Sequence, residues 1–327
     1  MDKVRELNTG ACMFRMKERE GKEMGAFFQQ FLVFAFLAGF GFMLARRGAL
    51  SEETTNEMSH ILIRYILPLT LFQSFLRPFD AQEALWLAGI MLFTAVVQVI
   101  YIILSRVLFG KDHPIDRYAV IFNNKAFVGI PIATSLFGPS CTFYISPSVV
   151  MSTLLIILYG SPLLNKKEKL SLKAITTLYK QPIFLAFFFG WVVYLLQIPI
   201  PPFLTSPLSA LAGINSTLAM IILGAFIAQK PLTGLFNTKR VWWVSFVRLV
   251  LFPLIPIVLL VLFPFGSVEL RMVTIVAWSC PTAINLALQA KIYDYDPYYA
   301  SQIIVVTCLG CALTIPVMLG IAQQVIH

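Results

Sequence analysis

The chain has 327 residues, of which 58% are hydrophobic and only 13% are charged, and its mean hydropathy is +0.80. Soluble globular domains carry about 25% charged residues, so the composition excludes a soluble globular protein and a disordered one. The long unbroken apolar runs exclude a β-barrel, in which apolar and polar residues alternate. The net charge of +9 lies in short loops between these runs and does not indicate binding of nucleic acid. The sequence therefore predicts an all-α polytopic membrane protein.

Residues 1–24 form a polar, charge-rich segment ahead of the first apolar run. A signal peptide would have a short apolar region and a small-residue cleavage site. Phe27–Ala45 is instead long enough to cross a membrane, so we expect it to stay in the mature protein. We expect residues 1–24 to be either a polar tail or an extension upstream of a native start at Met24.

Ten apolar runs approach the length of about 20 residues that a membrane helix needs. The longest central loop, Asn165–Gln181, divides them into a first five-helix repeat over residues 25–164 and a second over residues 182–327. The ten predicted spans are Phe27–Ala45, Ile61–Leu76, Leu85–Leu108, Tyr118–Phe137, Phe143–Leu164, Pro182–Leu196, Leu208–Ala228, Val241–Phe263, Met272–Ala290 and Ala300–Val325.

The distribution of basic residues predicts the orientation, because cytoplasmic loops are enriched in Lys and Arg. The odd-numbered loops contain 14 basic residues, whereas the even-numbered loops contain only Arg77 and Arg271. The loop at residues 165–181 is therefore expected in the cytoplasm, with both termini outside the plasma or inner membrane. The basic residues of the 1–24 segment fall on the wrong side, which favours a start at Met24.

The fourth span of each half combines proline with small and polar residues. Five spans per half is an odd number, so the second half must enter the membrane in the opposite direction. This predicts a 5+5 inverted repeat, the architecture of many secondary transporters. The residues concerned are Asn123, Asn124, Lys125, Gly129 and Pro131 in span four, and Ser279, Pro281, Thr282 and Asn285 in span nine.

Proline removes a helix hydrogen bond, and an unpaired backbone group in lipid costs several kcal/mol. Pro131 and Pro281 therefore predict two broken helices that meet at the midplane, although a simple kink is the alternative. The free N–H groups and positive dipole ends of such half-helices suit an anion, typically a carboxylate. We therefore expect the residues of spans four and nine to bind the substrate.

At these residues the sequence resembles the auxin efflux carrier family, which includes plant auxin exporters and bacterial malate or malonate permeases. The resemblance implies crossing broken helices and a homodimer. Lys125 departs from it, because the family usually has a small or polar residue there. The matching stretches are Asn124-x-x-Phe127-x-Gly129-x-Pro131, then Pro281-x-Ala283-x-Asn285 with Ala290, Tyr293, Asp296 and Ala300-Ser301, and Thr307 through Pro316.

No acidic residue lies in the middle of a predicted span, which argues against a relay of paired acids and against a cation substrate. Lys125 is expected to bind the anion, the alternative being that it snorkels to the cytoplasmic side. Arg64 is expected to snorkel. Further polar residues line the substrate path or only join helices; these are Gln73, Asn215, Ser216 and Arg248.

The preferred function is a secondary active transporter that moves a small organic anion by alternating access. The substrate would be a mono- or dicarboxylate, such as malate, malonate or an auxin-like acid, and the coupling ion a proton or a sodium ion. The alternative is a membrane receptor that binds a small ligand on the same fold without moving it. No catalytic motif or spacing of metal ligands is present, so neither an enzyme nor a cofactor is expected.

Overall fold

The computed structural model describes residues 29, 32–165, 180–229 and 238–326, and these residues are helical apart from loops and one isolated β-bridge. Five helices are long and apolar enough to cross a membrane: Ala81–Phe109, Cys141–Leu164, Pro202–Gln229, Lys239–Leu262 and Pro297–Val325. Shorter apolar helices are Leu32–Arg46, Lys125–Phe137 and Pro182–Leu196. The chain is therefore a multi-pass membrane protein, as predicted.

The apolar helices overlap the predicted apolar runs, whereas the polar helix Glu52–Ile61 precedes the second run and was not predicted. The segment at residues 1–24 and most of the Asn165–Gln181 loop lie outside the described residues. In chain order after Leu32–Arg46, the helices are α2 (Glu52–Ile61), η1 (Leu62–Ile66), α3 (Leu67–Ser74), α4 (Ala81–Phe109), α5 (Pro114–Ile121), η2 (Lys125–Gly129), α6 (Ile130–Phe137), α7 (Cys141–Leu155), η3 (Ile156–Gly160), α8 (Ser161–Leu164), α9 (Pro182–Leu196), α10 (Pro202–Gln229), α11 (Lys239–Phe246), η5 (Val247–Leu251), α12 (Phe252–Leu262), α13 (Val268–Trp278), α14 (Leu286–Ile292) and α15 (Pro297–Val325).

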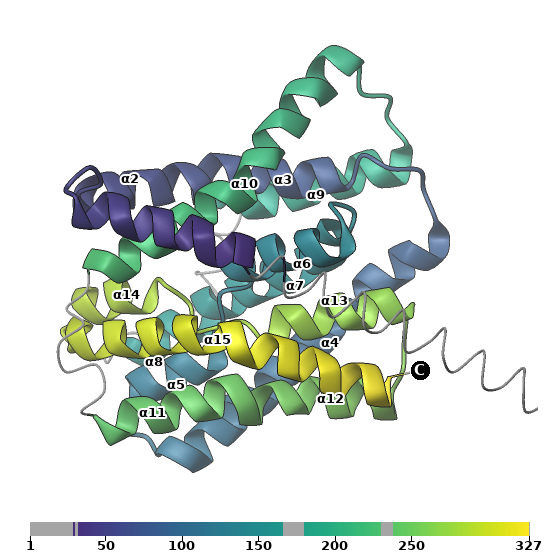
Figure 1. Cartoon of the computed structure of the whole chain (residues 1–327). Helices are drawn as coiled ribbons and strands as arrows, with labels where there is room; N and C mark the ends of the chain where they lie inside the picture. The colour runs from purple at the N-terminus through teal and green to yellow at the C-terminus, as the bar shows by residue number, and fades with distance from the viewer. Residues whose placement is uncertain (1–28, 30–31, 166–179, 230–237, 327) are drawn as a thin grey trace, which may run out of the picture.

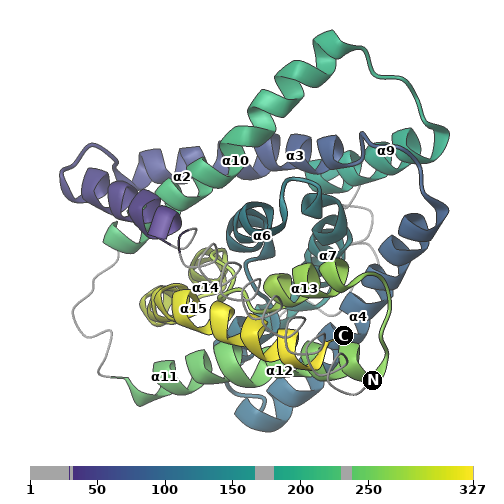
Figure 2. The ribbon, with the colours of Figure 1, turned by 45° about the vertical axis from the view of Figure 1, so that its right-hand side comes forward.

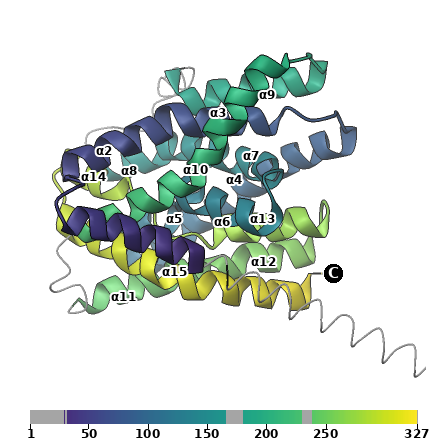
Figure 3. The same ribbon diagram turned by 45° about the horizontal axis from the view of Figure 1, so that its top comes forward.

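The helices form two groups (Figures 1 and 2). A side layer contains Leu32–Arg46, α2, η1, α3, α9 and α10, in which α3 packs on both α9 and α10. The core bundle contains the remaining helices, with α4 against α5 and α7, and α15 against α11, α13 and α14. The two groups meet where α10 packs on η2 and α6, and where α7 packs on α3 and α9. When the top is turned forward, α2, α3 and α9 lie along the upper side of the molecule and α11 and α12 along the lower side (Figure 3).

Two glycines let Leu32–Arg46 approach α10 at backbone distance. A Cβ atom built on Gly41 would lie 2.0 Å from the carbonyl oxygen of Ile221, and one on Gly224 would lie 1.8 Å from that of Ala38. Any larger residue would force the helices apart. Small residues at such crossings are the usual means of tight helix packing in membranes, where apolar surface alone gives no preference for a protein partner over lipid.

Four π-helical segments each end two residues before a proline. The segments are η1, η2, η3 and η5, and the prolines are Pro68, Pro131, Pro162 and Pro253. Proline has no N–H to donate and its ring crowds the preceding turn, and a widened turn relieves this without ending the helix. Proline therefore bends these helices while the chain stays helical.

Candidate functional site

The helices of spans four and nine are both interrupted, and the two interruptions pair with each other. Asn123 and Thr282 form an isolated antiparallel bridge. The N–H of Asn124 donates to the carbonyl of Pro281 at 2.8 Å, and the N–H of Ala283 donates to the carbonyl of Phe122 at 3.1 Å. Main-chain N–H and C=O groups that have no partner within one interrupted helix thus pair with those of the other. Such pairing is needed because an unpaired main-chain group is costly inside a membrane. We call this pairing, at residues 122–124 and 279–285, the crossing.

A side chain from each interruption donates a hydrogen bond to a carbonyl near the C-terminal end of the other half's helix. Asn123 Nδ2 donates to the Ala277 carbonyl at 2.6 Å, near the end of α13. Thr282 Oγ1 donates to the Ala119 carbonyl at 3.0 Å, near the end of α5. Each half therefore closes the helix end of the other, which fixes the two breaks side by side.

Arg248 of η5 lies behind the crossing and is fully buried. Its Nη1 donates to the Val120 carbonyl at 2.9 Å, and its Nη2 donates to the carbonyls of Trp278 and Cys280 at 2.8 and 2.9 Å. Nε also donates to the Cys280 carbonyl, at 3.1 Å. The guanidinium thus joins the C-terminal ends of both half-helices, where a cation is favoured by the helix dipole.

Lys125 begins η2, directly after the crossing, and only 2% of it is exposed. Nζ donates to Ser152 Oγ on α7 at 2.8 Å and lies 3.5 Å from the centroid of the Trp278 ring. The sequence suggested that Lys125 either binds substrate or snorkels to the membrane surface. The side chain does not reach the surface, and its ammonium group is held by the core bundle.

The break in span four lies before Pro131 and not at it. Pro131 is within the continuous helix Lys125–Phe137, where the π-helical turn accommodates it. Pro281, by contrast, lies in the interruption itself and accepts a hydrogen bond there. Gly129 allows close packing beside it, because a Cβ atom would lie 3.0 Å from Cys280 Sγ.

Helix α10 brings the side layer to the crossing. Ser216 Oγ lies 3.3 Å from Thr134 Oγ1 of α6, and neighbouring Asn215 is buried. Gln73 lies elsewhere, because its Nε2 donates to Ser209 Oγ within the side layer. Asn285 is exposed just before α14. Asn123, Asn124, Ser279, Pro281, Thr282 and Asn285 therefore lie in the crossing, with Asn285 at its exposed margin. Lys125, Gly129 and Pro131 follow it in the helix Lys125–Phe137, Arg248 lies behind it, and Gln73 lies outside it.

Several buried polar atoms near the crossing have no hydrogen-bond partner among the described residues. Asn124 Nδ2, Asn215 Nδ2 and Ser279 Oγ are such atoms, and each can donate a hydrogen bond. The Asn124 amide orientation follows from its Oδ1, which accepts from the N–H of Phe127. Unpaired buried donors are uncommon in proteins, so these three atoms call for a further partner, such as an ordered water or a ligand.

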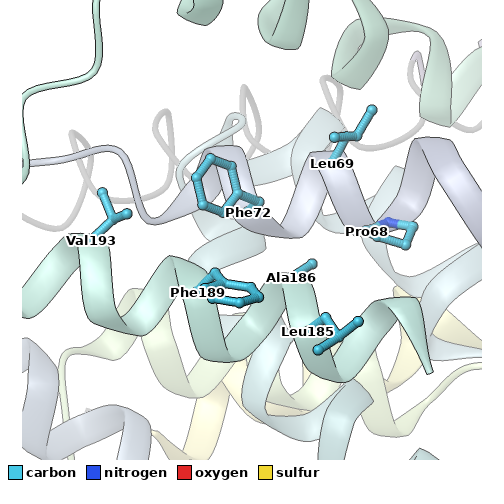
Figure 4. A pocket seen from close by; sticks show the side chains of 7 residues that line it. All are labelled: Pro68, Leu69, Phe72, Leu185, Ala186, Phe189 and Val193. Atoms are coloured by element: carbon cyan, nitrogen blue, oxygen red, sulfur yellow. The ribbon is translucent and has the colours of Figure 1, made fainter. Parts of the chain in front are cut away.

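An apolar groove on the outer face is separate from this site. It lies between α3 and α9 in the side layer and has only apolar side chains (Figure 4). Such a surface suits lipid chains and offers nothing to a charged substrate. Its lining residues are Pro68, Leu69, Phe72, Leu185, Ala186, Phe189 and Val193.

The residues around the Lys125 ammonium were missed from the sequence. They are Ser152, Trp278 and, through a 3.4 Å contact from Ser152 Oγ to its Oε1, Gln98 of α4. The only sign of them in the sequence was that Gln98 and Ser152 are polar residues in the middle of the third and fifth spans. Such residues also occur where two membrane helices are simply joined by a hydrogen bond.

Comparison with known proteins agrees with this reading of the fold. No individual curated protein matches the chain. A family model described as "Membrane transport protein" matches residues 26–319, which include all the helices of the crossing. The chain therefore belongs to the membrane transport protein family of the auxin efflux carriers.

Proposed function

We propose that the protein is a secondary active transporter that moves a small organic anion through the crossing by alternating access. The observation that carries this proposal is the charge of the site. Lys125 and Arg248 are both buried there, and no described carboxylate forms an ion pair with either of them. A buried positive charge without an acidic partner favours a negatively charged ligand.

The unpaired donors supply hydrogen bonds for such a ligand. Asn124 and Ser279 come from the core bundle and Asn215 from the side layer. A carboxylate is acceptor-only and can accept several hydrogen bonds at once. The positive end of the helix Lys125–Phe137 adds to its binding. We propose a mono- or dicarboxylate as the substrate, with Lys125 acting through its charge from behind Asn124.

Relative movement of the side layer and the core bundle would give alternating access. The crossing belongs to the core bundle and meets the side layer through α10, where the Thr134–Ser216 contact is polar and easily exchanged. We further propose the 5+5 inverted repeat of ten spans, a cell-membrane location and external termini. The charge bias of the loops and the two interrupted helices support this arrangement.

Uptake and counterflow in proteoliposomes, with a panel of radiolabelled mono- and dicarboxylates, would test the proposal. We expect saturable uptake of at least one carboxylate, with an apparent affinity about 2 kcal/mol weaker in a variant that combines Asn124→Ala with Ser279→Ala. The matched control is Ser209→Ala, which removes a hydroxyl from α10 outside the crossing. Binding of a carboxylate without any transport would refute the transporter and favour a receptor.

A further inference from the structure

Two neutral side chains contact the ammonium group of Lys125, and a third follows behind one of them. Ser152 Oγ accepts from Nζ at 2.8 Å, and the Trp278 ring lies 3.5 Å away on another helix. Gln98 Oε1 continues this set 3.4 Å from Ser152 Oγ. Gln98 and Trp278 are fully buried, and Ser152 is 6% exposed. We call Gln98, Ser152 and Trp278 the ammonium cage.

The cage has the chemistry of a site for a monovalent cation. A hydroxyl oxygen, an amide oxygen and the face of an indole ring all attract positive charge without neutralising it. The other charged group at Trp278 is Arg248, which donates to the Trp278 carbonyl and would repel Lys125. A buried ammonium is costly in a membrane protein, so its retention beside a second cation needs compensating contacts such as these.

The direction of the side chain separates this role from direct contact with substrate. Nζ bonds to α7, inside the core bundle, whereas the side layer meets the crossing through α10. Asn124, the preceding residue, has the unpaired donor. Lys125 therefore fills an internal site while Asn124 remains available.

We propose that the ammonium cage is a monovalent-cation site that the chain fills with a tethered cation, the Lys125 ammonium. In a transporter that carries an anion together with a cation, the bound cation supplies a positive charge next to the anion. The Lys125 ammonium supplies that charge without a bound ion, so, on the proposed function, transport needs neither a sodium nor a proton gradient.

Chemical rescue of Lys125→Ala tests whether the cage accepts a free cation. The substitution removes the end of the side chain, and n-propylammonium carries the same heavy atoms. We would follow thermal unfolding of the purified full-length chain in detergent by tryptophan fluorescence. We expect n-propylammonium, at about five times its dissociation constant, to raise the Tm of Lys125→Ala by about 1–2 °C.

Two controls make the rescue specific to charge and to the cage. Neutral 1-propanol should not raise the Tm of Lys125→Ala, because it fills the space without a charge. Wild type and Lys125→Met should not respond to n-propylammonium, because the lysine or methionine stem fills the space that its propyl chain needs. Equal effects of the alcohol and the ammonium, or no response of Lys125→Ala to n-propylammonium, methylammonium, potassium or sodium, would overturn the proposal.

If Lys125→Ala does not fold, a double-mutant cycle tests whether the cage holds the Lys125 ammonium. Lys125→Met keeps the bulk of the stem, and Ser152→Ala removes the hydroxyl that accepts from Nζ. Non-additive Tm shifts in the double variant would support an ammonium held by the cage. Additive shifts would overturn it.

Malonate uptake into proteoliposomes tests the consequence for coupling separately. We expect uptake by wild type to be the same in sodium and choline buffers, with or without a pH gradient. A sodium or proton requirement in wild type would overturn the uncoupled mechanism. Failure of malonate and every other carboxylate to enter would instead count against the proposed function, while the thermal rescue would still test the cage.

Discussion

Replacing Arg248 by alanine should destabilise the protein more than removing any other single cation of the core. The guanidinium donates to three buried carbonyls, those of Val120, Trp278 and Cys280. Each buried carbonyl left unpaired costs about 1–3 kcal/mol. Water entering the space would recover part of this, so we expect a loss of about 3–5 kcal/mol, the range for breaking a buried charged network.

The free energy of unfolding, measured by denaturant titration of the purified protein in mild detergent, would test this. Arg64→Ala is the matched control, because Arg64 is exposed, and its effect should stay within about 0.5 kcal/mol. Arg248→Lys should recover only part of the loss, because a compact ammonium cannot reach both helix ends as the planar guanidinium does. Equal stability of Arg248→Ala and Arg64→Ala would refute the assignment of Arg248 as the link between the two half-helices.

Four further measurements test the proposed site, the helix packing, the orientation and the homodimer. Asn124→Ala and Asn215→Ala should each weaken a transported carboxylate by about 1 kcal/mol, the worth of a neutral hydrogen bond, and unchanged apparent affinities would contradict the proposed site. Gly41→Ala should destabilise by about 1–3 kcal/mol through overpacking, whereas Gly39→Ala should have little effect, since a Cβ atom there meets nothing within 4 Å; equal effects of the two would be inconsistent with a backbone contact at Gly41. Cysteines placed in the loop at residues 165–181 should react only with membrane-permeant reagents in intact cells, and labelling from outside would reverse the proposed orientation. The proposed homodimer should be visible by native mass spectrometry in nanodiscs, where a monomeric mass would argue against it.

We propose the homodimer because the family resemblance implies one, and the exposed first half of α10 is an apolar face that a second subunit could cover. This part of α10 projects from the rest of the side layer (Figures 1 and 2). Phe203, Leu204, Leu211 and Ile214 are exposed along it. Lipid would cover such a face as readily as a second subunit, so apolar surface does not decide between them.

The sequence was sufficient to locate the helices and to identify spans four and nine as unusual. Clusters of proline, asparagine and glycine within apolar runs indicate interrupted membrane helices, and the interruptions at 122–124 and 279–285 lie inside those clusters. The position of the first break was not predictable from Pro131. A proline can be accommodated by a π-helical turn, and nothing local shows whether the helix will widen or stop.

The partners of the buried cations could not be read from the sequence. Arg248 lies about two turns into its span, where an arginine can snorkel to the surface as readily as it can turn inward. Its acceptors are main-chain carbonyls. Every residue has one, so the sequence does not show which carbonyls accept hydrogen bonds from Arg248. Gln98 and Ser152 are single polar residues in apolar helices, and their relation to Lys125 depends on how α4, α7 and α13 pack.

The two cations beside the crossing have different electrostatic roles, and this difference is the reason that we propose an anion as the substrate. The C-termini of two helices together carry about one negative charge, and Arg248 compensates it through its bonds at the ends of α5 and α13. Lys125 is held only by neutral groups and lies at the positive end of the helix Lys125–Phe137. After Arg248 and the carbonyls cancel, an uncompensated positive charge remains beside the unpaired donor of Asn124. A carboxylate bound there would neutralise that charge, whereas a cation would have to displace or deprotonate Lys125, so selectivity for an anion follows from the fixed charges of the proposed site.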